Sequence, residues 1–256
     1  MPPTVVVIDA VIAAGKTELL NSLTDRLRQF GVNVCAIPEP VEEWKLILPQ
    51  FYQDPIRWAY STQTFIIATR ILAINKAVKE NPRADVYLLE RSPETDQIFM
   101  SIQNVTDLER EMYMKWYDAY QLMLPIDLKT AKILYLKTSM GECMRRLAKR
   151  SRDGEGGVSV EYQIKLQNAH EEHFAKCGDR VVTIESELAD GNFLRDSGDT
   201  RIVDEILEKL GLRTTKVCRV APSPNIRHIH GVVLTERVAD KVMNWDQEYA
   251  DKERYN

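Results

Sequence analysis

The sequence has no marked excess of either charge and no long apolar run, and these two absences exclude whole classes of protein. Its 34 lysines and arginines stand against 38 aspartates and glutamates, a formal net charge of −4, whereas domains that coat nucleic acid carry a clear basic excess. No stretch reaches the ~18 uncharged apolar residues of a membrane-spanning helix, and no basic leader precedes an apolar segment at the N-terminus. We therefore expect no nucleic-acid partner, no membrane partner and an intracellular location, with the cytoplasm as the expected compartment.

Paired cysteines are also absent. The sequence has four cysteines, Cys35, Cys143, Cys177 and Cys218. They are far apart and form no C-x-x-C pair, so the sequence predicts neither a disulfide framework nor a zinc site. The pair His228-x-His230 lacks a third cysteine or histidine nearby, which favours a surface pair over a metal site.

What the sequence does contain is an alternation of short apolar runs and helical patterns. Hydrophobic residues make up 44% and charged residues 28%, as in folded globular domains. Strands are predicted at 4–9, 34–37, 86–89, 133–136 and 181–184. Helices are predicted at about 17–30, 55–80, 107–122, 140–151, 160–176 and 201–210. This order predicts an α/β fold, a doubly wound five-stranded parallel sheet with helices on both faces.

The pattern divides the chain into two parts. Residues 1–210 carry the alternation and are predicted to form one domain, whereas 211–256 form a C-terminal extension of unknown role that includes Pro222 and Pro224. Within the domain, the glycine-rich segment after a basic cluster predicts a positively charged lid at about 146–159.

A phosphate-binding loop is predicted between the first strand and the first helix. Residues 10–17, Ala-Val-Ile-Ala-Ala-Gly-Lys-Thr, fit G-x-x-x-x-G-K-[ST] except for Ala10. In this motif, backbone N–H groups cradle phosphates, here those of Ala13, Ala14 and Gly15. Lys16 neutralises the phosphates, and the Thr17 hydroxyl ligates Mg²⁺. Either the loop needs no left-handed backbone at position 10, or the ~1–2 kcal/mol cost of one there weakens ATP binding. The alternative is an ordinary turn in which Gly-Lys-Thr occurs by chance.

Carboxylates follow the second and third predicted strands. Glu39 follows the second strand, and Glu90-Arg91-Ser92 follows the third. The carboxyl ends of parallel strands meet at one edge of the sheet, where ligands bind, so these groups are expected beside the phosphate loop. Taken singly, each carboxylate is better read as a helix-start or surface group.

In combination, these motifs resemble the deoxynucleoside kinase family over roughly residues 4–210. The resemblance rests on the phosphate loop, Glu-Pro-Val-Glu-Glu-Trp at 39–44, Asp54-Pro55, Trp58-Ala59, Gln63-Thr64-Phe65, Glu90-Arg91-Ser92, the arginine-rich lid, Glu161-Tyr162 and His170-Glu171. It implies a P-loop kinase fold, ATP as phosphate donor, Mg²⁺ as cofactor, a deoxynucleoside as acceptor and a homodimer.

The resemblance also implies roles for single residues. Glu39 becomes the general base for the nucleoside 5′-hydroxyl, and Arg91 holds Glu39 and the 5′-oxygen. Lys16 acts on the phosphates, while Glu90 and Thr17 organise Mg²⁺. The lid arginines that close on the phosphates are Arg146, Arg150 and Arg152.

Nucleoside selection is assigned to the long predicted helix and its neighbours. The resemblance gives Gln63 a bidentate contact to the base, in a pocket lined by Trp44 and Tyr52. It also assigns Tyr52 and Glu155 to the sugar 3′-hydroxyl. Arg70 lies almost two turns from Gln63, on the same helix face. Arg70 and Asp96 match a charge pair of deoxycytidine and deoxyguanosine kinases, which would crowd a thymine methyl group and favour cytosine or purine bases. Ile66, where the family has a small residue, narrows the pocket.

The sequence also departs from the family pattern. The departures are Ala10, Ala13, Glu18, Pro93 and Gly154. They leave two alternatives to an active deoxycytidine or purine deoxynucleoside kinase. One is a catalytically weakened, kinase-like nucleotide-binding subunit of a larger assembly. The other is a thymidine or nucleoside-monophosphate kinase.

Overall fold

The computed structural model describes residues 2–150, 158–187 and 200–212. Its elements in chain order are β1 (Thr4–Asp9), α1 (Lys16–Gln29), β2 (Val34–Ile37), α2 (Ile47–Gln53), α3 (Pro55–Glu80), β3 (Val86–Glu90), α4 (Pro93–Ser101), α5 (Asp107–Leu122), β4 (Lys132–Lys137), α6 (Met140–Arg150), α7 (Val160–Ala175), the 3-10 helix η2 (Gly178–Arg180), β5 (Val181–Glu185) and α8 (Thr200–Lys209). Among these residues, no helix is long and apolar enough to span a membrane.

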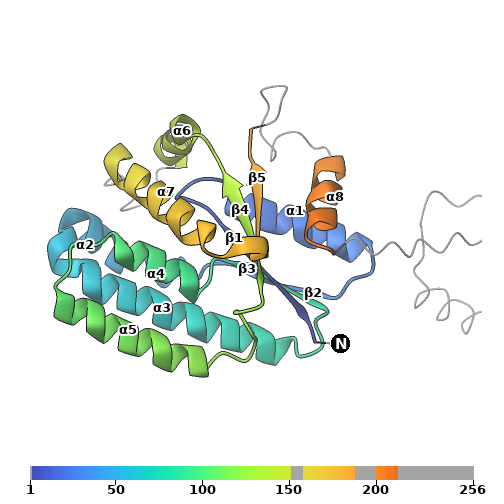
Figure 1. The fold of residues 1–256 in the computed structure, drawn as a ribbon, viewed down its shortest axis with the longest axis horizontal. Coiled ribbons are helices and arrows are strands. Elements are labelled where there is room, and N and C mark those ends of the chain that lie inside the picture. The colour runs from blue at the N-terminus through green and yellow to red at the C-terminus, as the bar shows by residue number, and fades with distance from the viewer. Residues whose placement is uncertain (1, 151–157, 188–199, 213–256) are drawn as a thin grey trace, which may run out of the picture.

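The five strands form one parallel sheet in the order β2-β3-β1-β4-β5. Parallel neighbours require crossover connections, which the helices supply. Figure 1 shows α1 and α8 on one side of the sheet, and α3, α4, α5 and α7 on the other. The predicted doubly wound α/β fold is therefore confirmed.

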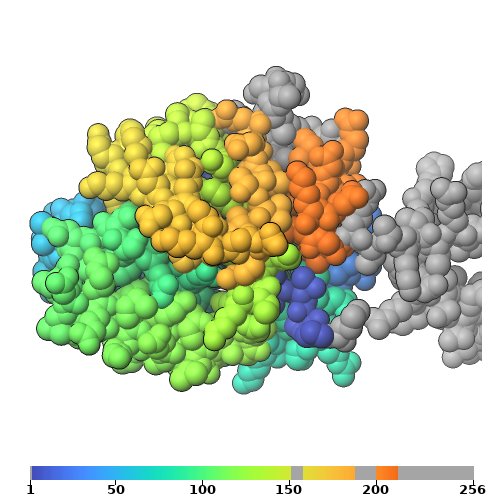
Figure 2. Space-filling model, in the orientation of Figure 1, coloured from blue at the N-terminus to red at the C-terminus, as the bar shows by residue number. Residues whose placement is uncertain are grey.

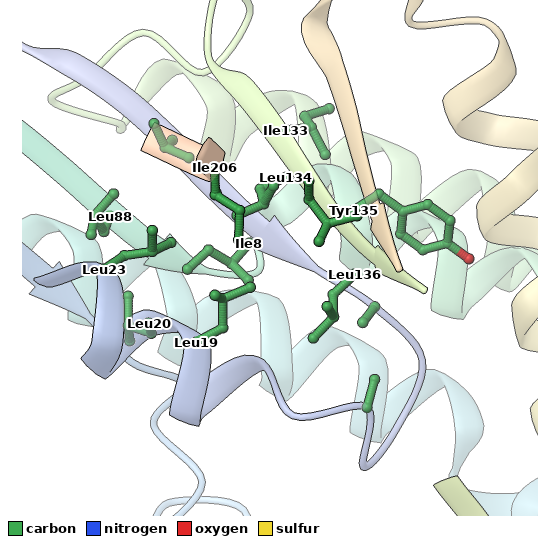
Figure 3. Close-up of a cluster of buried hydrophobic side chains, with 14 of the residues drawn as sticks. Ile8, Leu19, Leu20, Leu23, Leu88, Ile133, Leu134, Tyr135, Leu136 and Ile206 are labelled. Carbon is green, nitrogen blue, oxygen red and sulfur yellow. The ribbon is translucent and has the colours of Figure 1, made fainter. Parts of the chain in front are cut away.

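Strand residues alternate between the two helical layers, as the period of a β-strand requires. On one face, Ile8 lies in the core built around α1 (Figure 3), and its neighbours there are Leu19, Leu20, Leu23, Leu88, Leu134 and Ile206. On the other face, Val7 packs in a cluster with Ile74 of α3, and the Tyr135 ring lies 5.0 Å from the Phe174 ring of α7. The central strand β1 is buried on both sides, which explains its unbroken apolar run.

The helix ends follow sequence signals. Gly31 closes α1 with a backbone φ of 75°, and two bonds fill the helix end: Gly31 N–H donates to the Arg28 carbonyl at 2.9 Å and Val32 N–H to the Leu27 carbonyl at 3.1 Å. This is the Schellman arrangement, which favours glycine. At the start of α3, the Asp54 side chain accepts from Arg57 N–H at 3.1 Å.

Two α-helices, α2 and α4, were not predicted. α2 contains Pro49 in its first turn, a position that tolerates proline. α4 begins with Pro93, and its first turn is closed by a capping box between Ser92 and Thr95. Pro93 is therefore compatible with the structure, because a first helical residue needs no donor.

The described chain extends two residues beyond the predicted domain end. Leu210 and Leu212 both belong to the core cluster around α1. The domain boundary at 210 stays a prediction, but the packing favours an end at or after Leu212.

Candidate functional site

A cleft of about 830 Å³ opens at the carboxyl edge of the sheet. The predicted residues that line it are Ala13, Gly15, Lys16, Thr17, Glu39, Trp44, Tyr52, Gln63, Glu90, Arg91, Arg146 and Arg150. Three others, Ala14, Arg70 and Asp96, are buried behind the lining. Arg152 and Glu155 lie outside the described residues. The structure thus gathers predicted phosphate, base and catalytic residues around one cavity.

The phosphate loop joins β1 to α1 without strain at Ala10. The positive φ angles of the loop are at Ala13, 63°, and Gly15, 108°. Of the two alternatives for Ala10, the first is therefore correct: position 10 needs no left-handed backbone. The cost of ~1–2 kcal/mol for a left-handed L-residue falls on Ala13 instead.

Gln163 of α7 holds the outer part of the loop. Its side-chain amide donates to the Ile12 carbonyl at 2.8 Å and its amide oxygen accepts from Ile12 N–H at 3.2 Å. Gln163 is fully buried. Gln163 was not among the predicted site residues, since a glutamine in a helical pattern carries no signal that distinguishes it from a surface residue.

Lys16, Thr17 and Glu90 form an oxygen-rich corner beside the loop. The Thr17 hydroxyl donates to Glu90 Oε1 at 2.9 Å and lies 3.0 Å from Oε2, and Lys16 Nζ lies 4.0 Å from Glu90 Oε1. Burial and the charge of Glu39 raise the pKa of Glu90. Burial, followed by the charge of Arg91, lowers the pKa of Lys16. A hydroxyl and a carboxylate in contact are hard oxygen ligands that fit Mg²⁺.

Glu39 stands in the cleft wall between two arginines. Its Oε1 accepts from Arg70 Nη2 at 3.0 Å and from Arg91 Nη1 at 3.2 Å. Burial acts to raise the pKa of Glu39, but Arg91, Arg70 and Lys16 together lower it to about 2. Glu39 is therefore an ionised carboxylate at neutral pH.

Arg91 reaches Glu39 from a left-handed backbone. Its φ is 64°, and its guanidinium also donates to the Ala10 carbonyl at 2.8 Å. The guanidinium carbon lies 4.6 Å from the centre of the Phe99 ring. A non-glycine residue in this conformation costs about 1–3 kcal/mol and persists only where its surroundings enforce it.

Asp9 helps to hold Arg91 in this left-handed conformation. Its Oδ1 lies 3.6 Å from Arg91 Nε and 3.3 Å from His170 Nε2, and the Thr95 hydroxyl donates to its other oxygen. Burial acts to raise the pKa of Asp9, but His170, Arg91 and Thr95 lower it overall. Asp9 was not among the predicted site residues, although an acidic residue at the end of an all-apolar strand was a signal for a functional or structural role.

The part of the cleft that α3 lines contains polar groups that the protein leaves unsatisfied. Within the described residues, Gln63 Oε1 and Thr62 Oγ1 are buried without a hydrogen-bond partner, and both side chains line the cleft. Buried polar atoms are normally bonded, so these two are suited to a polar ligand. Trp44 is fixed nearby, because its indole N–H donates to Thr69 Oγ1 at 2.9 Å.

Arg70 and Asp96 form a bidentate ion pair behind this wall. Arg70 Nε donates to Asp96 Oδ2 at 2.8 Å and Nη2 to Oδ1 at 3.1 Å, while Nη1 donates to the Glu90 carbonyl at 3.1 Å. Burial raises the pKa of Asp96 despite the charge of Arg70. The pair contacts the cleft through the bond from Arg70 to Glu39, and Ile66 of the same helix lines the cavity.

Arg146 of α6 is attached to the phosphate loop. Its Nη1 donates to the Ala14 carbonyl at 2.6 Å and its Nε to Glu142 Oε1 at 2.6 Å. A Cβ at Gly15 would lie 3.1 Å from the same guanidinium, and this close contact, together with the φ of 108°, favours glycine there.

Comparison with known proteins adds the following. A family model described as "Deoxynucleoside kinase" matches residues 6–210. A probable deoxycytidine kinase of Fowlpox virus (strain NVSL) is 32% identical over 203 residues, which span 74% of this chain and 80% of the relative. Deoxycytidine kinase 2 of Gallus gallus is 29% identical over 197 residues, 65% of this chain and 71% of the relative. The deoxycytidine kinase of Homo sapiens is 28% identical over 193 residues, which span 64% of this chain and 72% of the relative.

Proposed function

The chain belongs to the deoxynucleoside kinase family, and from that premise we propose that deoxycytidine is its preferred acceptor and that Glu39 and Arg91 carry the transfer. The protein phosphorylates a deoxynucleoside with ATP as phosphate donor. The observation that carries the residue assignment is the ionised Glu39 carboxylate, held by two arginines in the wall of a cleft whose floor is the phosphate loop.

In the proposed reaction, the nucleoside 5′-hydroxyl donates a hydrogen bond to Glu39 and attacks the γ-phosphorus of ATP in line. Glu39 takes the hydroxyl proton as the new P–O bond forms, and ADP leaves with the bridging oxygen. A carboxylate with a pKa of about 2 is a weak base, which is adequate because the transition state of phosphoryl transfer is loose and needs little prior deprotonation. Its main contribution is to orient the hydroxyl.

Positive charge around the transferring group comes from Lys16 and the arginines. Lys16 and the backbone N–H groups of Ala13, Ala14 and Gly15 are proposed to hold the ATP phosphates. Arg91, and Arg150 at the cleft edge, are proposed to stabilise the negative charge that spreads over the equatorial oxygens. Arg146 and Arg152 complete the proposed lid.

Thr17 and Glu90 are the residues proposed to hold Mg²⁺. When bound there, the ion supplies positive charge to the β- and γ-phosphates. The contact between the Thr17 hydroxyl and the Glu90 carboxylate beside Lys16 supports this assignment.

The proposed preference for deoxycytidine rests on the wall of the cleft. Gln63 offers an unsatisfied amide oxygen for the base, and Ile66 narrows the cavity. The Arg70–Asp96 pair, buried behind the lining, is proposed to act on the site through Glu39 and to hold the wall so that it leaves no room for a thymine methyl group. Tyr52 and Glu155 are proposed to hold the sugar 3′-hydroxyl. The relatives compared above, named as deoxycytidine kinases, support this choice.

We also propose a homodimer that acts in the cytoplasm. Support for the dimer comes from large apolar side chains exposed on α3 and α5, among them Leu72, Leu108 and Trp116 at 63%, 66% and 47% exposure. The cysteines of the described chain are free, as expected in a reducing compartment.

The test is to incubate the purified protein with Mg-ATP and each of the four deoxynucleosides and to quantify the monophosphates. We expect product from deoxycytidine with kcat/KM at least about tenfold above that for thymidine, the lower end of the discrimination that one additional carbon gives in a closed pocket. A Lys16→Gln variant is the control against a contaminating kinase. Bound nucleoside without product would overturn activity in this chain, and thymidine as the best substrate would overturn the argument from Arg70 and Asp96.

A further inference from the structure

A sulfur, a nitrogen and an oxygen donor meet where α4 packs against α7, and none of the three residues lines the cleft. Glu94 lies in the first turn of α4, His173 in the last turn of α7, and Cys177 just beyond it. His173 Nε2 is 2.9 Å from Glu94 Oε1, and Cys177 Sγ is 3.6 Å from the same oxygen. All three donor atoms lie within 4.8 Å of one another, and each residue is half-buried.

The fold brings these donors together. His173 and Cys177 are four residues apart, so a helical backbone places them on one face. The α4–α7 contact then carries Glu94 to that face, and Figure 2 shows the two helices forming adjoining parts of one surface. The spacing along the chain gave no signal, because Glu94 lies far from the other two residues in sequence and carboxylates are not part of cysteine-spacing patterns.

The donor set matches zinc. Zn²⁺ binds thiolate, imidazole and carboxylate at ~2.3, ~2.0–2.1 and ~2.0–2.2 Å in a tetrahedron, which separates nitrogen from oxygen donors by roughly 3.3–3.5 Å and sulfur from either by roughly 3.5–3.7 Å. The Cys177–Glu94 distance of 3.6 Å falls in this range. The His173–Glu94 distance of 2.9 Å is that of a hydrogen bond, so metal binding must lengthen it by roughly 0.4–0.6 Å. Mg²⁺ and Ca²⁺ require oxygen ligands and do not suit this set.

Arg180 orients the carboxylate and leaves one oxygen available. Its Nη2 donates to Glu94 Oε2 at 3.0 Å and to the Leu128 carbonyl at 3.2 Å, and its Nε donates to the Ala131 carbonyl at 3.1 Å. The contact occupies Oε2 and points Oε1 toward His173 and Cys177. Outer groups that fix ligands in this way are regular features of metal sites, although the positive charge of Arg180 also lowers the affinity for a cation.

We propose that Glu94, His173 and Cys177 form a zinc-binding site, with water as the fourth ligand. Binding replaces the thiol proton of Cys177 by the metal and releases it to solvent. The bound ion joins the end of α7 to the first turn of α4. Since α4 also carries Asp96, metal binding stabilises the helix that supports Arg70 and Glu39.

The probe is Co²⁺, added alone to the chelator-treated, full-length protein under reducing conditions. We expect one equivalent to bind with the ligand-field absorption of tetrahedral cobalt and a thiolate-to-cobalt charge-transfer band, and Zn²⁺ to displace it. Mg²⁺ should not compete. Zn²⁺ should also raise the Tm in a concentration-dependent way.

Two variants locate the site. Cys177→Ser should abolish the charge-transfer band, and His173→Gln should weaken Co²⁺ binding by more than the ~10–100-fold that loss of an outer-shell partner costs. His173→Gln serves alone if Cys177→Ser does not fold. The matched control is Cys218→Ser/His228→Gln/His230→Gln, which removes the cysteine and both histidines of the C-terminal extension and should leave the band intact.

Three results would overturn the proposal. They are absence of the charge-transfer band at stoichiometric Co²⁺, persistence of the band in Cys177→Ser, and its loss in the control variant. In the first case the three side chains form only a hydrogen-bonded cluster between α4 and α7.

Discussion

The two alanines of the phosphate loop occupy different backbone conformations. Ala13 has a φ of 63°, a conformation that costs an L-residue roughly 1–2 kcal/mol. The φ angle of Ala10 is not positive, and its methyl group is fully buried. The same substitution should therefore have opposite effects at the two positions.

Ala13→Gly should leave the free energy of unfolding unchanged or raise it by up to about 1 kcal/mol. The glycine removes the strain of the left-handed backbone. It also raises the entropy of the unfolded chain, which lowers the free energy of unfolding by ~0.4–1 kcal/mol. Ala10→Gly should lower the free energy by about 1–2 kcal/mol, because it loses buried methyl area and gains unfolded-state entropy. Urea denaturation of both variants is the measurement. Equal losses would contradict the assignment of strain to Ala13.

Glu39→Gln should separate catalysis from binding. The amide keeps the shape of the carboxylate but cannot accept the hydroxyl proton, so kcat should fall by ~10²–10⁴ while the Kd for nucleoside changes little. Glu42→Gln is the matched control, since Glu42 is an exposed carboxylate nearby that pairs with Lys45, and it should retain full kcat. Equal losses of binding and of kcat in Glu39→Gln would assign Glu39 a role in holding the nucleoside.

Glu39 should also make stability depend on pH in an acidic window. Its pKa falls from 4.5 to about 2 on folding, so its stabilising contribution is complete above pH ~4.5 and is lost as the pH falls toward 2. At neutral pH the contribution is on the order of 3 kcal/mol. The difference in unfolding free energy between the wild type and Glu39→Gln should stay constant from about pH 7 to 5 and shrink below pH ~4.5. A difference that shrinks above pH 5 would mean that the pKa of Glu39 is not lowered.

Single-residue patterns predicted which residues gather at the cleft but not how they are held. Lys16, Thr17, Glu39, Glu90 and Arg91 follow strands or the loop, so topology alone places them at one edge. The left-handed backbone of Arg91, by contrast, depends on Asp9, Thr95 and His170, which come from three different elements. Local sequence carries no information about tertiary contacts that hold a backbone in an unfavourable conformation.

Among the elements, length and periodicity decided what could be predicted. α3 has a steady pattern in which Ile67, Ile71 and Ile74 are buried, and its bounds match the predicted 55–80. α2 and α4 have only 7 and 9 residues, too few turns for a periodic signal. The capping box of α4 used Thr95 in place of the usual Glu or Gln, which removed the sequence signature of a helix start.

The docking of α8 on α1 combines an ion pair with apolar packing, and the two should contribute unequally. Arg26 donates to both oxygens of Asp204 at 2.6 Å, with side chains 24% and 15% exposed, whereas Ile206 is 1% exposed. Ile206→Ala should cost about 2–5 kcal/mol, and Arg26→Gln about 1 kcal/mol or less because solvent screens the pair. Chemical denaturation of both variants tests this. A larger loss for Arg26→Gln would show that the charge pair dominates.

For the whole molecule, alternation of strands and helices was enough to predict a doubly wound parallel sheet. The order β2-β3-β1-β4-β5 was not predictable by the same means. Periodicity reports which face a residue occupies, but it does not report which strands are neighbours. The resemblance to a family supplied that information only implicitly, through the motifs that must share one edge.

The end of the domain can be located by truncation. Gly211 has a φ of 71°, and the last turn of α8 is closed by Gly211 N–H to the Glu208 carbonyl at 2.9 Å and Leu212 N–H to the Leu207 carbonyl at 2.8 Å. Leu212 packs into the core beside α1, so a chain ending at residue 210 loses both bonds and this buried side chain.

A chain ending at residue 212 should therefore keep the Tm and the kcat/KM of the full chain, because every proposed site residue precedes it. A chain ending at residue 210 should unfold with a free energy about 2–4 kcal/mol lower and a Tm lower by several degrees. Thermal unfolding followed by circular dichroism, together with the deoxynucleoside assay, measures both. Loss of folding or activity in the chain ending at 212 would place part of the fold or of the site in residues 213–256, and equal stability of the two truncations would exclude Leu212 from the core.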